Sequence, residues 1–442
     1  MELGVGGNQY FEDLFFEIIP DVIDRLRSLT LKVAPRDLED VASRLSSPAP
    51  ILEYLWLCAD VRFESEWHPR LPLEFFGSDL SSLRKLCLYC VNTKLPWRNM
   101  VNLTWLEVGY MSSDVISATE LLDFLESAPR LQQVSLKGVP LIPDAQHGRL
   151  VQFSCLEGFH FQGYGSSSPL FNHLLIPPGT DLRITLRSPL PRVEDFLPRP
   201  LDNLENLQNF TGICIKHSPF MTSTEFTGPS GRVVLYLEFY GSGYPNTSFE
   251  PLVFFDTSKT TYLELRRNRL PPEGVSYQVL LSMTNLHTLA ISRCSNLPPL
   301  FIALDPNRNS PHTLICSNLE KLIFRIGGVD EFDDQGMTSM VAARAQRGAK
   351  LKSVRIFGQV ESTLIAELGN HVSHVVYDPD IDGVIIEDDN DGNASVSYLA
   401  IASSSTILTF GRCIGSTACA MSVALLALDR FRLSAALTPP VG

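Results

Sequence analysis

One apolar spacing recurs along most of this chain. An apolar residue is followed by two residues, a second apolar residue, one further residue and a third apolar residue. The clearest copies are Leu286/Leu289/Ile291 and Leu319/Leu322/Phe324. Further copies begin at Leu26, Leu52, Leu83, Leu103, Leu131, Leu156, Val234, Leu351 and Val372, with weaker ones at Ile184, Phe210 and Leu263. Successive copies mostly start 20 to 33 residues apart, and a unit of that size cannot bury its own apolar face. The repetition therefore predicts stacked coils, that is, a solenoid.

Each apolar triplet predicts a short strand whose apolar side chains face the interior, and stacked strands predict a parallel sheet. The connecting segments predict helices over 35–45, 119–127 and 333–347. Loop signals make 165–255 the least regular part. Asn268 and Cys294 lie three residues after a last strand apolar residue, where leucine-rich repeats use such side chains to satisfy backbone groups. We expect an α/β leucine-rich-repeat solenoid, a curved parallel sheet with helical or irregular connectors on its convex side.

The organisation that follows has four parts. Residues 1–21 are expected to form a lead-in helix or turn, and residues 22–377 the repeats. Residues 378–394 read as an acidic linker, and 395–442 as an apolar, weakly structured tail. A membrane span needs about 20 largely apolar residues, but Arg412 and several serines interrupt the apolar stretch 395–428. We therefore do not expect membrane insertion.

The outward side chains of the strands predict a binding face. In each unit, the residue before the second apolar position and the residue after it point away from the interior, so stacking makes two columns on the concave face. Two clusters stand out in these columns. The first contains Tyr54, Trp56, Trp105 and Glu107; the second contains Tyr236, Glu238, Tyr262 and Glu264, on what we expect to be adjacent units. Aromatic residues are frequent hot spots of protein interfaces, and stacked acids suit a basic partner segment. The alternative is that aromatic residues simply favour strands.

Charge argues against a nucleic-acid partner. The formal net charge of the 442 residues is −13, and no dense run of Lys or Arg is present. About half of the acidic excess lies in one segment, Asp378 to Asp391, which holds seven acids and no base. The nine cysteines are odd in number and scattered, and no secretory signal opens the chain, so we expect reduced thiols in the cytoplasm or nucleus.

Motifs for catalysis, cofactors and metals are missing from the sequence. No glycine-rich phosphate loop follows a strand, and no nucleophile elbow is present. Cys87-x-x-Cys90 lies on a predicted strand where its two thiols face opposite sides, and His371-x-x-His374 has no third ligand nearby. Glu238 and Glu264 form a carboxylate pair without a neighbouring nucleophile or histidine. We expect no cofactor, no metal and no enzyme activity.

Three phrases of the chain resemble a known family. They are Arg25-Leu-Arg-Ser-Leu-Thr-Leu31, Leu121-Leu-Asp-Phe-Leu-Glu-Ser-Ala-Pro-Arg-Leu-Gln-Gln-Val-Ser-Leu136 and Leu351-Lys-Ser-Val-Arg-Ile356. They are similar to the F-box and leucine-rich-repeat proteins of mushroom-forming fungi, over roughly residues 20–377. The resemblance implies a substrate receptor of a cullin-based ubiquitin ligase, whose repeats hold a protein substrate while an N-terminal F-box docks on a Skp-type adaptor.

The resemblance does not reach the F-box itself. An F-box usually opens with a Leu-Pro-x-Glu phrase, and Tyr10 to Arg25 does not match it. Docking on a Skp-type adaptor is therefore not supported, and the chain is either truncated or a repeat-only relative. Our expectation is a non-catalytic protein-interaction module like the substrate-recognition region of an F-box receptor. The alternatives are a repeat-only scaffold or inhibitor without a ubiquitin role, and a membrane-tethered interaction protein that uses 395–428.

Overall fold

The computed structural model describes residues 2–6 and most of residues 22–379. The residues inside this span that it does not describe are 34–39, 42, 60–75, 77–79, 92–99, 111–115, 140, 143, 147, 165–167, 189–192, 219–220, 240–248, 268–269, 271, 309–313 and 328–331. The expected acidic linker, apart from Asp378 and Pro379, and the whole expected tail lie outside the described residues.

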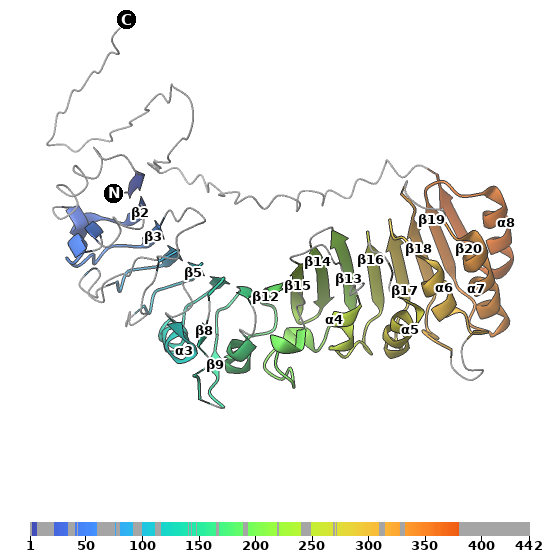
Figure 1. Ribbon diagram of the computed structural model, residues 1–442, viewed down its shortest axis with the longest axis horizontal. Helices are drawn as coiled ribbons and strands as arrows, with labels where there is room; N and C mark the ends of the chain where they lie inside the picture. Colours follow the sequence, from blue (N-terminus) through green and yellow to red (C-terminus); the bar gives the residue numbers. More distant parts are fainter. Residues whose placement is uncertain are drawn as a thin grey trace, which may run out of the picture.

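A single long sheet organises the described chain (Figure 1). Its sixteen strands lie in the order β1 (Glu2–Gly6), β2 (Ser28–Val33), β3 (Tyr54–Ala59), β4 (Lys85–Tyr89), β5 (Trp105–Gly109), β7 (Gln133–Lys137), β10 (Gly158–Tyr164), β12 (Asp181–Ser188), β15 (Gly231–Phe239), β14 (Met221–Gly228), β13 (Gly212–Ser218), β16 (Tyr262–Arg266), β17 (Thr288–Ser292), β18 (Lys321–Arg325), β19 (Ser353–Phe357) and β20 (His374–Asp378). Neighbouring strands are parallel except where β14 pairs with β13 and with β15. The protein is therefore an α/β protein with a long, mostly parallel sheet.

The helices cover one side of this sheet (Figure 1). They are α3 (Ala118–Ser127), α4 (Glu250–Val253), α5 (Glu273–Ser282), α6 (Pro298–Leu304), α7 (Asp334–Gln346) and α8 (Ser362–His371). Towards the C-terminus, α5 packs against α6, α6 against α7 and α7 against α8. Shorter connectors include the 3-10 turns η1 (Ile23–Arg25), η3 (Ser168–His173), η4 (Val193–Asp195) and η5 (Glu205–Leu207), and the strand pairs β6 (Ile116–Ser117) with β8 (Leu141–Ile142) and β9 (Val151–Gln152) with β11 (Leu174–Leu175). Predicted helices 119–127 and 333–347 correspond to α3 and α7 and are confirmed.

The recurring apolar triplets form the core between the sheet and the connectors. Leu286, Leu289 and Ile291 are all buried, and Leu322 and Phe324 occupy the matching positions of the next strand. These residues belong to one hydrophobic cluster that runs from Ile23 to Val372. Each fully buried side chain of this size contributes about 1.5 to 3 kcal/mol, so the repeated burial supplies the main driving force for stacking.

The same backbone turn, a residue with a positive φ, follows several of the strands. Cys90, Tyr110, Arg267 and Arg293 each follow the last residue of a strand and have φ values of 54°, 56°, 51° and 52°. In this left-handed conformation each N–H donates to the carbonyl that ends the next strand, as from Tyr110 to Lys137 at 2.7 Å and from Arg293 to Arg325 at 2.8 Å. The bonds join neighbouring units just as the chain leaves the sheet, so no buried N–H is left without an acceptor at these turns.

One of the two predicted turn side chains can be checked. The Cys294 thiol donates to the Leu265 carbonyl of the preceding unit at 3.3 Å, which confirms its predicted role. Asn268 lies outside the described residues. A second set of side chains joins the units just before the strands begin. Asn285 Nδ2 donates to the Ser258 carbonyl at 2.8 Å, and Asn318 Nδ2 to the Thr284 carbonyl at 3.0 Å.

Two expectations about the chain path are wrong. Residues 2–6 do not form a helix or turn; they form strand β1, which pairs in parallel with β2. In the middle of the sheet, the chain passes from β12 to β13, returns through β14 to β15, and then passes over to β16. Strand β15 is therefore separated from β16 by β14 and β13. Two tight antiparallel connections, from β13 to β14 and from β14 to β15, replace parallel crossovers here. The described residues of 165–255 contain no long helix that could carry a crossover.

Ser117 fixes the start of α3 through a capping box. Its Oγ accepts a hydrogen bond from the Glu120 N–H at 2.9 Å, and the Glu120 carboxylate accepts from the Ser117 N–H at 3.4 Å. We expect Ser117→Ala to lower the free energy of unfolding by about 1 kcal/mol, because the first turn of the helix loses an acceptor. Urea denaturation checks the value. Ser117→Asp retains an acceptor and is the control; equal losses in both variants would contradict a capping role.

Candidate functional site

The face of the sheet opposite the core, here called the open face, presents alternate residues of each strand in continuous rows. From β2 to β10 the first row contains Ser28, Tyr54, Lys85, Trp105, Gln133 and Gly158, and the second contains Thr30, Trp56, Cys87, Glu107, Ser135 and His160. The structure therefore places Tyr54 and Trp56 on β3 and Trp105 and Glu107 on β5, with Lys85 and Cys87 of β4 between the two pairs.

A third row lies one step further along the strands. It contains Lys32, Cys58, Tyr89, Gly109, Lys137 and Gln162 over the same strands. This row was not among the predicted columns, which end at the third apolar residue of each triplet. The residue after that apolar position must face outward again, because side chains alternate along a strand, so the signal was present in the sequence.

The aromatic patch consists of Tyr54, Trp56, Tyr89 and Trp105. The rings of Trp56 and Tyr89 are tilted by 50° with their centroids 6.3 Å apart. The Lys85 ammonium lies 5.5 Å from the centre of the Trp105 ring, a cation–π arrangement. Trp105 keeps 37% of its surface exposed, in contrast to Leu106, the next residue in the strand, which is buried. The patch therefore presents a large aromatic surface held by fixed neighbours.

Charged groups support the patch from the third row. The Lys137 ammonium lies 2.6 Å from Glu107 Oε1 and 6.0 Å from the centre of the Tyr89 ring. Burial and then a hydrogen bond to Glu107 raise the pKa of the Tyr89 phenol above its usual range. The phenol therefore stays protonated and donates to the carboxylate. Glu107 is thus held by two neighbours, and it orients Tyr89 rather than standing free for a basic partner.

The second predicted cluster is not a cluster. Tyr236 and Glu238 lie on β15, whereas Tyr262 and Glu264 lie on β16, with two strands between them. The pairing across β14 and β13 also places Tyr236 level with Arg266 and not with Tyr262. Glu238 pairs with Arg187 of the neighbouring strand β12. The prediction assumed that consecutive copies of the apolar triplet are neighbours in space, and the reversed path of the chain breaks that assumption.

Glu264 is the centre of a polar network and not an exposed acid. It is buried and accepts hydrogen bonds from Tyr262 Oη at 2.9 Å and Arg266 Nε at 2.8 Å, with Arg325 Nη1 at 3.5 Å. Burial by itself raises the pKa of its carboxyl, but the Arg266 contact outweighs burial and the net pKa lies below the usual range. The carboxylate is therefore charged at neutral pH and already neutralised inside the protein.

No catalytic arrangement is assembled on the described open face. Ser135 lies between Glu107 and His160 in the second row, but its buried Oγ has no hydrogen-bond partner there. Burial, then the charges of Lys137 and Arg183, lower the pKa of His160 to about 4, far from the value that suits a general base at neutral pH. Burial also raises the pKa of the Cys87 thiol to about 12, so it is protonated and unreactive.

Within the described ranges, no group of three His, Cys, Asp or Glu side chains is arranged to hold a metal ion. No helix of the described chain combines the length and apolar character needed to cross a membrane. The seven described cysteines are all free thiols. A comparison of the sequence with protein-family models and with curated proteins finds no match.

Proposed function

We propose that this chain is a leucine-rich-repeat solenoid that binds a protein partner on its open face and catalyses no reaction of its own. The residue-for-residue register of its parallel strands supports the first part, because it aligns the same buried apolar positions from β2 to β10 and again from β16 to β19. Repeat proteins of this architecture use such continuous faces for binding.

The aromatic patch carries the proposal. Trp105 is more than one-third exposed although its backbone is fixed in a central strand and its ring is held by Lys85. Large, rigid aromatic side chains of this kind contribute strongly to protein interfaces, since they bury much surface at little cost in side-chain entropy. Lys85 and Lys137 next to the rings favour a partner segment that combines apolar or aromatic side chains with carboxylates.

We expect Trp105→Ala to weaken binding of the partner by at least about 30-fold, which corresponds to about 2 kcal/mol, the threshold of a hot spot. The partner is first identified by proximity labelling, and its affinity for the purified chain is then measured by calorimetry. Phe357→Ala, at a half-buried aromatic residue far along the same face, is the matched control and changes the affinity less than twofold. The melting temperature should stay within about 2 °C for Trp105→Ala, because the ring is not in the core. An unchanged affinity would refute the patch as the binding site.

The role in ubiquitin transfer is a separate part of the proposal. We propose that the chain resembles the substrate-recognition region of an F-box receptor, supported by the helix and strand that residues 121–136 form as α3 and β7. The test is co-purification with a Skp-type adaptor, using the coding sequence upstream of Met1 where it exists. Binding of the partner without the adaptor favours the alternative, a repeat-only scaffold or inhibitor.

A further inference from the structure

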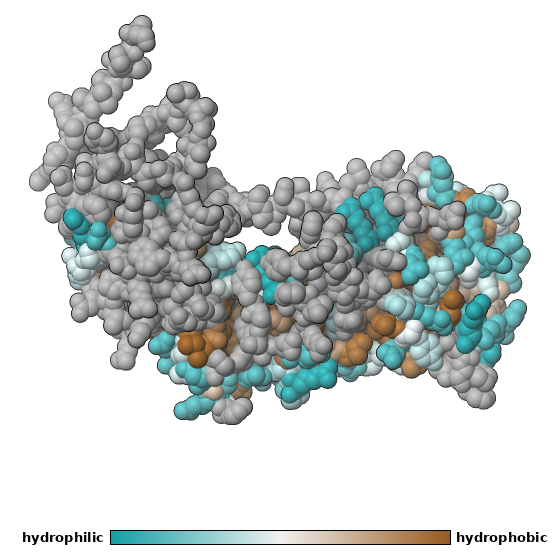
Figure 2. Space-filling view, in the orientation of Figure 1, coloured by the Kyte–Doolittle hydropathy of each residue, from teal (hydrophilic) through white to brown (hydrophobic). Residues whose placement is uncertain are grey.

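Basic side chains gather on the open face of the C-terminal strands. The basic face, as we define it, consists of Lys216, Arg266, Lys321, Arg325 and Arg355 on β13, β16, β18 and β19, together with Arg293 at the turn after β17. In the described part of the same rows the acids are Glu264 and Asp378. Figure 2 shows hydrophilic surface over the upper ends of strands β16–β18. Positive charge is thus concentrated here although the whole chain carries a net charge of −13.

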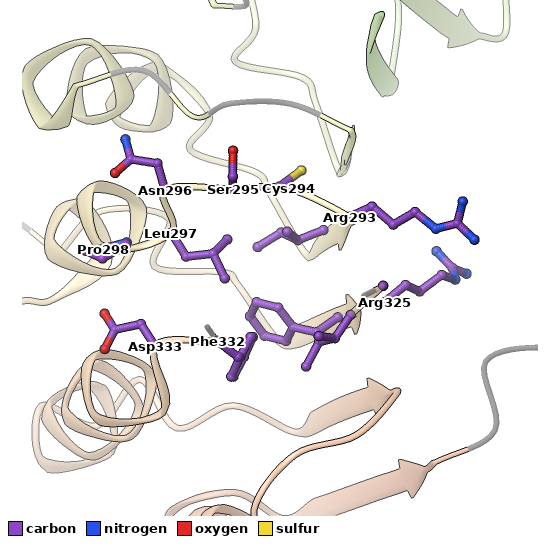
Figure 3. Close-up of a pocket in the computed structure, with 13 residues that line it drawn as sticks. Arg293, Cys294, Ser295, Asn296, Leu297, Pro298, Arg325, Phe332 and Asp333 are labelled. Carbon is purple, nitrogen blue, oxygen red and sulfur yellow. The ribbon is translucent and has the colours of Figure 1, made fainter. Parts of the chain in front are cut away.

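Two of these arginines stand side by side. Figure 3 shows the Arg293 and Arg325 side chains extending in the same direction from neighbouring strand ends. Arg325 Nη1 lies 3.5 Å from Glu264, which also neutralises Arg266. Arg293 is exposed and forms no ion pair with any described residue. One carboxylate, that of Glu264, is therefore shared by two guanidinium groups, and Arg293 beside them has no described acid as a partner. Guanidinium groups placed side by side favour further carboxylates as ligands.

A pocket of about 280 Å³ opens beside the two arginines. It lies between the ends of β17 and β18 and the starts of α6 and α7, and Leu297 and Phe332 give it an apolar wall (Figure 3). Asp333 also lines it, but its carboxylate accepts the Gly336 N–H at 2.9 Å as the cap of α7. The site thus offers an apolar recess next to Arg293, which has no described acid as a partner, and Arg325, which shares Glu264 with Arg266. It suits an extended peptide in which aliphatic side chains alternate with carboxylates.

The chain itself contains such a peptide. Residues 378–391 read Asp-Pro-Asp-Ile-Asp-Gly-Val-Ile-Ile-Glu-Asp-Asp-Asn-Asp, with seven acids, four aliphatic residues and no base. Its first residue, Asp378, ends β20 in the same row as Arg325, with only β19 between the two strands. Strands lie about 4.8 Å apart, so Arg325 and Arg293 are roughly 10 and 14 Å from that point along the sheet. Twelve extended residues span up to about 40 Å, which is more than enough.

We propose that the acidic segment Asp378–Asp391 docks on the basic face of its own chain. Its carboxylates pair with Arg293 and Arg325, and one of its aliphatic side chains enters the pocket beside Leu297 and Phe332. Tethering makes this an intramolecular equilibrium at a high effective concentration, so the segment excludes other acidic peptides from the basic face. Charge pairing at an exposed site also makes the docking sensitive to salt.

The test uses the full chain and a fluorescein-labelled synthetic peptide with the sequence of residues 378–391. In a neutralised variant, Asp380, Asp382, Asp388, Asp389 and Asp391 are changed to Asn and Glu387 to Gln. We expect the peptide to bind this variant at least tenfold more tightly than the unaltered chain, because its own segment no longer competes. Binding should weaken at least tenfold between 50 mM and 500 mM salt.

Two further substitutions, each made in the neutralised variant, test whether the peptide binds at the basic face. Arg293→Ser removes an exposed side chain and should reduce peptide binding at least tenfold, whereas Arg347→Ser, an equal change of charge at an exposed position on the helix side, should leave it unchanged. Equal affinity of the unaltered and neutralised chains would overturn the proposal and assign the basic face to an acidic partner from outside the chain. Absence of binding, or binding that survives Arg293→Ser, would also overturn it.

Discussion

Replacing Arg344 by alanine is expected to lower the free energy of unfolding by about 3 to 5 kcal/mol. Arg344 lies on α7 and is completely buried. Its Nη1 donates to the Ile315 carbonyl at 2.9 Å and its Nη2 to the Cys316 carbonyl at 2.8 Å. Burial lowers the pKa of the guanidinium below its usual value, but an arginine remains protonated in a protein. Its charge is therefore solvated inside the protein by the carbonyl groups of the turn before β18.

The expected loss has two physical sources. Truncation removes the side-chain donor of the Ile315 carbonyl and leaves the Cys316 carbonyl with the Leu319 N–H alone, and it leaves a cavity where the long side chain was. The turn is also strained, since Cys316 has a φ of 46°, and the Cys316 thiol bonds to the Leu280 carbonyl of α5. Arg344 thus ties α7 to the turn that aligns β18 with β17.

Urea unfolding followed by circular dichroism measures the loss of stability in Arg344→Ala. Arg347→Ala, at an exposed position three residues further along the chain, is the control and should change the free energy of unfolding by less than about 0.5 kcal/mol. A loss below 1 kcal/mol for Arg344→Ala would show that the turn holds its conformation without the arginine.

Phe226→Ala is expected to cost about 3 to 5 kcal/mol, and the loss should be concentrated in one part of the sheet. Phe226 is completely buried on the core side of β14. Its ring centroid lies 4.8 Å from that of Phe210 and 4.7 Å from that of Phe255. Phe210 precedes β13 and Phe255 follows α4, so the three rings join the reversed strands to the connector before β16.

Hydrogen exchange is the measurement that locates this effect. In a stack of repeats each unit contacts mainly its neighbours, so the loss of one packing cluster opens the local strands before the rest. We expect faster exchange in β13, β14 and β15 and unchanged exchange in β2 to β5. Phe357→Ala, which removes a half-buried ring from the open face, should leave β13–β15 protected. Uniform loss of protection along the whole sheet would contradict the local character of the cluster.

Most of the parallel strands on either side of β13, β14 and β15 could be predicted from the sequence. The apolar spacing identified the strands from β2 to β10 and from β16 to β20, and the buried residues of all of them except β20, because a triplet with that spacing must place its apolar side chains on one side of a strand. In β20, which has a described sheet neighbour on one side only, Tyr377 of the triplet is 40% exposed. The aromatic patch followed from the same rule. The third row, with Tyr89, Lys137 and Arg325, required only one further step of the alternation.

The position of β12 shows where the pattern becomes ambiguous. Leu182, Ile184 and Leu186 are all buried, so the strand has three equivalent apolar positions two residues apart. If Ile184 and Leu186 are taken as the second and third apolar residues of the triplet, Arg183 falls in the first row. The structure aligns Leu182 with Phe159, which puts Asp181 in the first row and Arg183 in the second. A shift of two residues preserves which side chains are buried, so hydrophobicity alone cannot choose between the two registers.

The sequence by itself determined which side of the sheet most strand side chains face, because that choice depends on alternation within each strand. Only the tertiary structure decided which strands are neighbours. An inward-facing pattern is the same for a parallel and an antiparallel strand, so the reversal of β13, β14 and β15 leaves no mark on local periodicity. It separates Tyr236 from Tyr262. Contacts between strands also decide that Glu264 is buried beside Arg266 of its own strand and Arg325 of β18. Which charges meet depends on contacts between units, and those contacts exist only once the sheet has assembled.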